Sequence, residues 1–167
     1  MPAPRQHPHD DDLPIDPDLD DHAPGSWATT DQLVATAPTA RILGVIGAGG
    51  ALGGVARYVV AEALPTSPGG FPWATLLVNA SGSLLLGLLM VLVAEVLAPS
   101  PYVRPFLGVG VLGGFTTFST YTGEVRALLE GRSGPLALVY LFATVGVCLV
   151  ATLLGIRLGR LVEARRA

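Results

Sequence analysis

The chain has 167 residues, of which half are hydrophobic and only 14% are charged, so it is long enough for one domain but too apolar for a typical soluble one. Its net charge of -3 belongs to residues 1–40, which contain eight of the thirteen acidic residues and all three histidines. Residues 41–167 hold nine arginines against five glutamates, a balance of +4. This distribution indicates a membrane protein and gives no indication of a nucleic-acid partner.

The N-terminal segment is rich in Asp and Pro and poor in large apolar residues. Such a segment cannot bury enough surface to offset the entropy of ordering it, so we expect residues 1–40 to be disordered. It also lacks the basic start of a signal peptide. The sequence therefore predicts three parts: an acidic tail over residues 1–40, a membrane domain over residues 41–160 and a short basic tail over residues 161–167.

Four apolar segments follow one another beyond residue 40. They cover residues 42–64, 74–98, 106–129 and 135–158, and short connections rich in turn-forming residues separate them. Each is long enough to cross a bilayer at about 1.5 Å per residue. The predicted fold class is an all-α membrane protein with four transmembrane helices and both termini on one side.

The arginines predict which side that is. Seven of them lie at the chain ends or in the middle connection: Arg5, Arg41, Arg104, Arg157, Arg160, Arg165 and Arg166. Only Arg57, Arg126 and Arg132 lie elsewhere. Because basic residues near span ends tend to stay in the cytoplasm, we expect both termini there.

The third apolar segment contains the sequence GGFTTFSTY over residues 113–121. Its two glycines and its hydroxyl residues combine poor helix propensity with side chains that compete for backbone hydrogen bonds, which predicts a break in the middle of this span. Non-helical backbone at membrane depth is tolerated only where it is buried or lines a wet cavity. The carbonyl oxygens freed by a break are suitable ligands for a small hard cation.

Aromatic residues recur every three positions through the same sequence, as Phe115, Phe118 and Tyr121. Ring edges carry partial positive charge, so such rings, together with hydroxyls such as those of Ser119 and Thr120, could hold a small anion that has lost its water. Packing, or anchoring at the membrane surface, is the alternative interpretation.

Polar residues interrupt the other spans as well. Residues 140, 144, 148 and 152 (Tyr140, Thr144, Cys148 and Thr152) are four apart and share one helical face, which indicates a polar track. The alternative is that these hydroxyls bond to their own helix or join helices together. Asn79 is costly in hydrocarbon unless its amide is hydrogen-bonded, and bonding between helices is one way to achieve this.

Two charged residues, the single cysteine and two pairs of glycines each allow a simple structural interpretation. Arg57 and Glu124 lie near span ends, where either could simply reach water. Cys148 is the only cysteine, which excludes an intrachain disulfide and favours a buried, inert thiol. Two glycine pairs at spacing four are typical of close helix contacts, namely Gly50 with Gly54 and Gly110 with Gly114.

Three motifs together resemble the CrcB/Fluc fluoride channels: GGALGGVARY at residues 49–58, TLLVNASGSLLLG at residues 75–87 and GVLGGFTTFSTYTGE at residues 110–124. The resemblance implies a passive, fluoride-specific channel, not an enzyme, that exports fluoride across the cell membrane and so relieves its toxicity. It further implies an antiparallel dimer of four-helix subunits, with two fluoride pathways and a structural sodium ion at the dimer centre.

The resemblance also assigns roles to individual residues. The sodium would be held by the backbone carbonyls of Gly113 and Thr116. The fluoride pathway would be lined by Asn79, Phe118, Tyr121, Tyr140, Thr144 and Cys148, with Arg57 and Glu124 in the vestibules. Tyr121 stands where the family has a second phenylalanine, and Cys148 stands where it usually has a hydroxyl residue.

Two other functions and one question about the partner are left open. A small proton-coupled exporter would need a carboxylate deep in the first span, where this chain has Gly and Ala. A non-conducting subunit of a heterodimer is the other alternative. An antiparallel homodimer requires one sequence to insert both ways, whereas seven arginines against three favour one orientation and hence a paralogous partner.

Overall fold

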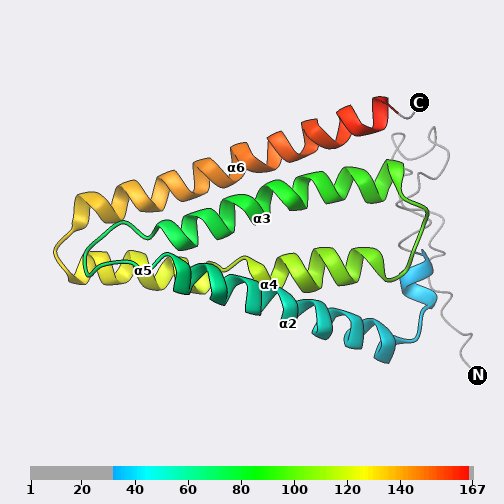
Figure 1. Ribbon diagram of the computed structural model, residues 1–167, viewed down its shortest axis with the longest axis horizontal. Helices are drawn as coiled ribbons and strands as arrows, with labels where there is room; N and C mark the ends of the chain where they lie inside the picture. The colour runs from blue at the N-terminus through cyan, green and yellow to red at the C-terminus, as the bar shows by residue number, and fades with distance from the viewer. Residues whose placement is uncertain (1–31, 166–167) are drawn as a thin grey trace, which may run out of the picture.

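The computed structural model describes residues 32–165, and within them every regular element is a helix (Figure 1). The elements are α2 (Thr39–Ala63), α3 (Trp73–Val91), the wide-turn π-helices η3 (Leu92–Val96) and η4 (Arg104–Leu112), α4 (Gly113–Phe115), α5 (Phe118–Glu130) and α6 (Gly134–Ala164). α2, α3, the interrupted segment from η4 to α5, and α6 run in alternating directions along the bundle, so that α2 begins and α6 ends at the same end (Figure 1).

Three helices of the described residues are long and apolar enough to cross a membrane: Thr39–Ala63, Trp73–Glu95 and Gly134–Ala164. They correspond to the first, second and fourth predicted spans, and they make this an all-helical membrane protein. The segment over residues 104–130 is divided into shorter helices. That it forms a fourth span stays a prediction.

Helical structure extends beyond both predicted boundaries of the membrane domain. Of the segment expected to be disordered, residues 1–31 lie outside the described residues, but residues 32–36 are helical and α2 begins at Thr39. At the other end α6 continues to Ala164, through part of the predicted basic tail. Just before this extension, Gly159 lies directly against the Val91 side chain of α3.

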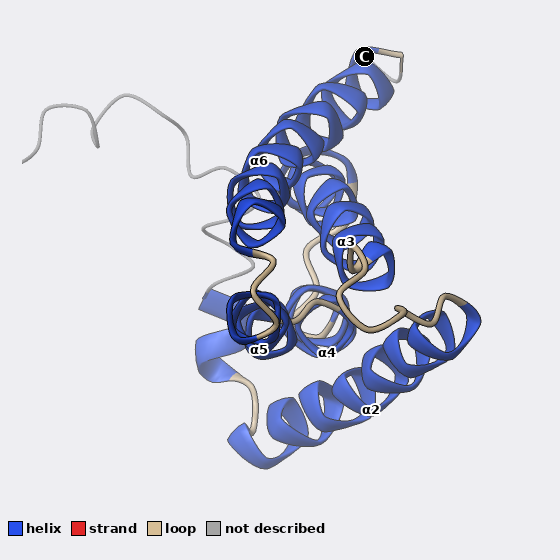
Figure 2. Ribbon diagram, turned by 90° about the vertical axis from the view of Figure 1, so that its left-hand side faces the viewer, coloured by secondary structure: helices blue, strands red, loops and turns tan. Residues whose placement is uncertain are grey.

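Glycines bring the helix backbones together in two places. Gly87 and Gly155 lie where α3 meets α6, and a Cβ atom on Gly155 would collide with the carbonyl oxygen of Leu84. On the other side of the interrupted segment, α2 packs against η4 and α4 (Figure 2). There Gly110 approaches the backbone of Gly49.

Only part of the predicted glycine pairing is found. Gly110 and Gly114 both lie against the α2 backbone, as their spacing indicates. On α2, however, a Cβ atom at Gly54 would meet no atom within 4 Å. The close contacts come instead from Gly49, Gly50 and Gly53, because that face of α2 is the one turned toward η4 and α4.

Within the stretch predicted to be broken, the helix is interrupted at two threonines, and the glycine pair stays helical. Gly113 and Gly114 are helical, whereas Thr116 has φ -73 and ψ 157 and Thr117 has φ -148 and ψ 125, both extended. Thr117 caps the next helix, because its hydroxyl oxygen accepts from the Thr120 N–H at 3.1 Å. The glycines serve packing, while the threonine cap fixes where α5 begins.

Candidate functional site

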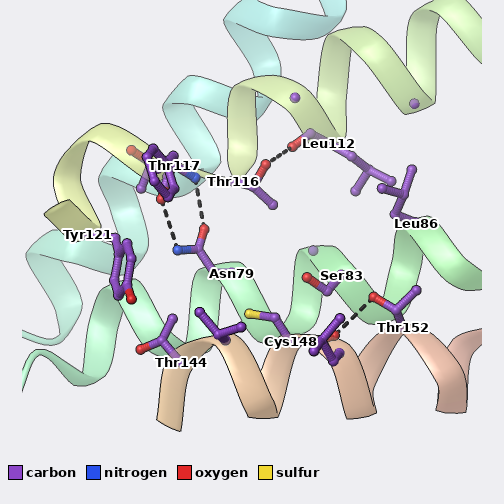
Figure 3. Close-up of a pocket in the computed structure, with 16 residues that line it drawn as sticks. Asn79, Ser83, Leu86, Leu112, Thr116, Thr117, Tyr121, Thr144, Cys148 and Thr152 are labelled. Carbon is purple, nitrogen blue, oxygen red and sulfur yellow. Dashed lines mark hydrogen bonds between the residues drawn. The ribbon is translucent and has the colours of Figure 1, made fainter. Parts of the chain in front are cut away.

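An open cavity of roughly 460 Å³ lies between α3, the interrupted segment and α6 (Figure 3). Five of the predicted pathway residues line it: Asn79, Phe118, Tyr121, Thr144 and Cys148. Both residues predicted to hold sodium, Gly113 and Thr116, also line it. Its wall contains no Arg, Lys, Asp or Glu side chain, so the polar character of this cavity comes from neutral groups.

Asn79 on α3 is joined to the break by two hydrogen bonds (Figure 3). Its Nδ2 donates to the Thr117 carbonyl oxygen at 2.9 Å, and its Oδ1 accepts from the Thr117 N–H at 2.8 Å. The amide thus satisfies a donor and an acceptor that the interrupted helix leaves without a partner. Asn79 thus bonds to a second helical segment, as the alternative interpretation expects, and it also lines the cavity.

These bonds leave two carbonyls without the donor that a continuous helix would provide. The N–H of Thr117, four residues after Gly113, goes to Asn79. The N–H of Thr120, four residues after Thr116, goes to the Thr117 hydroxyl. The oxygens of Gly113 and Thr116 are therefore available to a cation, and they fit one that prefers oxygen ligands.

The two aromatic residues of the predicted pathway have different surroundings. The Phe118 ring is 76% exposed and Tyr121 is only 4% exposed, with their centroids 5.8 Å apart. The Tyr121 hydroxyl donates to the Leu141 carbonyl oxygen of α6 at 2.7 Å. Its polar atom is therefore bound by backbone, and what Tyr121 contributes to the cavity is mainly its ring.

The polar face of α6 supplies one side of the cavity (Figure 3). Thr144 is 4% exposed, and its Oγ1 is buried without any hydrogen-bond partner in the described part of the chain. Thr152 donates to the Cys148 carbonyl at 2.9 Å, which is the bonding within one helix that the alternative interpretation expects. Thr144 is the exception, since an unpaired buried hydroxyl costs about 1–3 kcal/mol and calls for an explanation.

Glu124 and Tyr140 form a second polar cluster beyond the cavity, and Thr75 joins them. The two carboxylate oxygens of Glu124 accept from Thr75 Oγ1 at 2.9 Å and from Tyr140 Oη at 2.7 Å. Tyr140 is fully buried, and the rings of Phe71 and Tyr121 each lie 5.3 Å from its own. The cluster fixes the Glu124 carboxylate in place.

Arg57 lines a smaller cavity of about 230 Å³, together with Thr75, Thr117 and Thr120. The Nε of Arg57 is buried and has no hydrogen-bond partner within residues 32–165. Thr117 lines this cavity and the larger one, so the break separates the two. Ser119, also predicted to line the pathway, is exposed and lines neither of them.

The family model described as "CrcB-like protein, Camphor Resistance (CrcB)" matches residues 44–156. This range contains the broken helix, both cavities and the polar face of α6. The chain belongs to the CrcB-like family. It is therefore placed among channels rather than enzymes, as the three motifs predicted.

Several relatives of this CrcB-like chain carry a functional name. It is 50% identical over 114 residues to "Fluoride-specific ion channel FluC 2" of Nocardia farcinica, covering 68% of the chain and 81% of the relative. It is 48% identical over 116 residues to a protein named "Fluoride-specific ion channel FluC" in Thermus thermophilus, covering 69% and 92%. For "Fluoride-specific ion channel FluC 2" of Streptomyces avermitilis the identity is 47% over 105 residues, covering 63% and 66%.

Two site residues of this CrcB-like chain were not among those predicted. Thr75 binds Glu124, and the signal for it is its position one helical turn before Asn79, which places both on one face of α3. Thr117 provides the cap and the contacts to Asn79, and the signal for it is a threonine directly before a new helix. Neither signal identifies the partner, which lies far away in the sequence.

Proposed function

We propose that this chain is a subunit of a fluoride-specific channel of the cell membrane, through which fluoride leaves the cell passively. The names of the relatives support fluoride as the ion. The observation that carries the proposal is Thr144, which lines a cavity without charged side chains and whose buried hydroxyl has no hydrogen-bond partner among the described residues. A hydroxyl in that position is a donor for a small anion that has shed its water.

The absence of a fixed positive charge in this cavity matters for conduction. Ions pass only if binding is favourable enough to enter and weak enough to leave, and a neutral donor meets both conditions better than an arginine. Arg57, with its partnerless Nε, lies in the smaller cavity across Thr117, where it attracts anions toward the path. Among the residues that the structure describes, no carboxylate lines either cavity, although a proton-coupled exporter would need one.

A second subunit, arranged antiparallel to the first, completes the path. Phe118 is 76% exposed although it lines the cavity, and a dehydrated anion needs a wall on that side. A sodium ion at the centre of the pair would be held by the carbonyl oxygens of Gly113 and Thr116 from each subunit. Bound there, sodium supplies the positive charge that balances these oxygens and joins the two breaks.

The partner is either an identical chain or a paralogue. Streptomyces avermitilis contains relatives named FluC 2 and FluC 3, so paralogues occur within one organism, and the arginine bias favours a single orientation with both termini in the cytoplasm. The tyrosine at position 121, where the family has a phenylalanine, does not by itself favour a paralogous partner, because its hydroxyl is bound to the Leu141 carbonyl. C-terminal reporters active on only one side of the membrane decide this point, since equal signals from both would exclude a single orientation.

The experiment that tests the function is release of fluoride from liposomes containing the purified chain, compared with release of chloride. The proposal requires fluoride to leave and chloride to stay.

A further inference from the structure

An apolar groove lies outside the proposed ion path, where α2 begins and the chain enters η4. Its volume is about 440 Å³, and six residues line it: Arg41, Gly44, Val45, Ala48, Tyr102 and Phe106. These residues belong to one end of the bundle, since α2 starts there and the connection into η4 passes there (Figure 1). None of them takes part in the cavities described above.

The groove is polar only at one end. Arg41 is the third residue of α2, and among residues 32–165 its guanidinium group has neither an ion-pair nor a hydrogen-bond partner. Ala48 lies seven residues further along the same helix, about 10 Å deeper at 1.5 Å per residue. Tyr102 is 36% exposed and is of a residue type enriched at the membrane–water interface. The groove thus leads from a cation at the membrane surface into hydrocarbon depth.

We propose that this groove binds one anionic phospholipid, with its phosphate group on the Arg41 guanidinium and an acyl chain along Val45, Ala48 and Phe106. The charge of the occupant follows from Arg41, which can bind a phosphate through two parallel hydrogen bonds. Its apolar part follows from the remaining wall, which contains no other charged group. A soluble phosphate compound would leave that wall exposed.

Two glycines of α2 allow a matched test. A Cβ atom at Gly44 would meet no atom within 4 Å, so Gly44→Leu fills the groove without disturbing the fold. Gly47 is equally open but does not line the groove, so Gly47→Leu makes the same chemical change outside it. For the charge, Arg41→Gln is paired with Arg160→Gln, an exposed arginine of α6 outside the groove.

Native mass spectrometry of the purified full chain, titrated with phosphatidylglycerol or with phosphatidylcholine, counts the lipids bound at each concentration. The phosphatidylglycerol complex should form about fivefold more tightly, the factor that one basic side chain contributes at a membrane surface. Arg41→Gln should abolish that preference, and Gly44→Leu should weaken binding of both lipids. Arg160→Gln and Gly47→Leu should behave as the wild type.

Equal binding of the two lipids by the wild type would overturn the proposal. The proposal would also fail if Gly44→Leu and Gly47→Leu lost lipid binding equally, or if Arg41→Gln and Arg160→Gln did. The groove would then have no special role in binding. A third outcome identifies a different occupant: if Gly44→Leu dissociates a dimer while leaving lipid binding unchanged, the groove is a contact between copies of this chain.

Discussion

Asn79 and Thr117 bind each other through both polar atoms of the asparagine amide, at 2.8 and 2.9 Å, across 38 residues of sequence. This pairing allows a helix to stop and restart without leaving the Thr117 backbone unsatisfied. It also directs the Thr117 N–H away from the Gly113 carbonyl, which is thereby freed. One side chain thus connects the stability of the break with its capacity to hold a cation.

Asn79→Asp should destabilise the protein and abolish fluoride flux while leaving the dimer intact. The aspartate lacks the N–H that bonds to the Thr117 carbonyl and places oxygen against oxygen, a loss of about 1–3 kcal/mol in the free energy of unfolding. Its charge also repels anions in the adjacent cavity. Thermal unfolding, size-exclusion chromatography and liposome flux measure the three effects. Ser81→Ala is the control, because Ser81 bonds only within its own helix; undiminished flux through Asn79→Asp would remove Asn79 from the path.

Tyr121→Phe should leave fluoride flux close to that of the wild type. The variant keeps the ring and loses only the hydrogen bond to the Leu141 carbonyl, so the free energy of unfolding should fall by about 1 kcal/mol. Tyr121→Ala, which removes the ring, should abolish flux. If instead the Phe variant lost flux while remaining folded, the hydroxyl itself would be part of the path.

Gly53→Ala should destabilise the contact between α2 and α4. Its Cβ atom would collide with the Val111 carbonyl and lie 2.7 Å from the Phe115 nitrogen, and overpacking of this kind costs about 1–3 kcal/mol. Gly54→Ala meets no atom within 4 Å and should be neutral or stabilising by up to about 1 kcal/mol, because alanine favours helix. Thermal unfolding of the two variants compares them directly. Equal melting temperatures would show that this contact is looser than the structure indicates.

Sodium should raise the melting temperature of the dimer relative to potassium or choline at equal ionic strength. A cation held by the Gly113 and Thr116 carbonyls binds only the folded pair, and at 100-fold excess over its Kd it would add about 2.7 kcal/mol. The effect should saturate at one sodium per two chains. Melting curves that are the same in all three salts would argue against the sodium site.

The spacing of residues predicted the helices, and it predicted that Thr144, Cys148 and Thr152 share one face of α6; that this face lines an ion path stays a prediction. Thr144 was found because it repeats with Cys148 and Thr152 at four-residue intervals, a pattern that a single helix preserves without help from tertiary structure. The first, second and fourth spans were likewise predicted to within a few residues at the majority of their ends. Length and hydropathy are sufficient to identify a helix that crosses lipid.

What depends on contacts between distant residues was not predicted. The glycine pair has poor helix propensity, yet it remains helical because Gly114 packs against Gly50 of α2. Within the stretch predicted to be broken, the interruption falls at Thr116 and Thr117, where a cap and the Asn79 amide compensate for the lost backbone bonds. Propensity cannot locate such a break, because it is a local quantity and these partners lie on other helices.

The central claim is that fluoride passes along the face of α6 that carries Thr144, and release of fluoride from liposomes tests it most directly. The wild type should release fluoride and retain chloride. Thr144→Val should cut fluoride release about tenfold or more, since a hydrogen bond to a charged group is worth about 1.5–3 kcal/mol, without lowering stability, because the hydroxyl has no protein partner to lose. Thr122→Val, at an exposed hydroxyl bonded within its own helix, should conduct as the wild type does. Equal release of fluoride and chloride by the wild type, or full fluoride release by a folded Thr144→Val protein, would contradict this account.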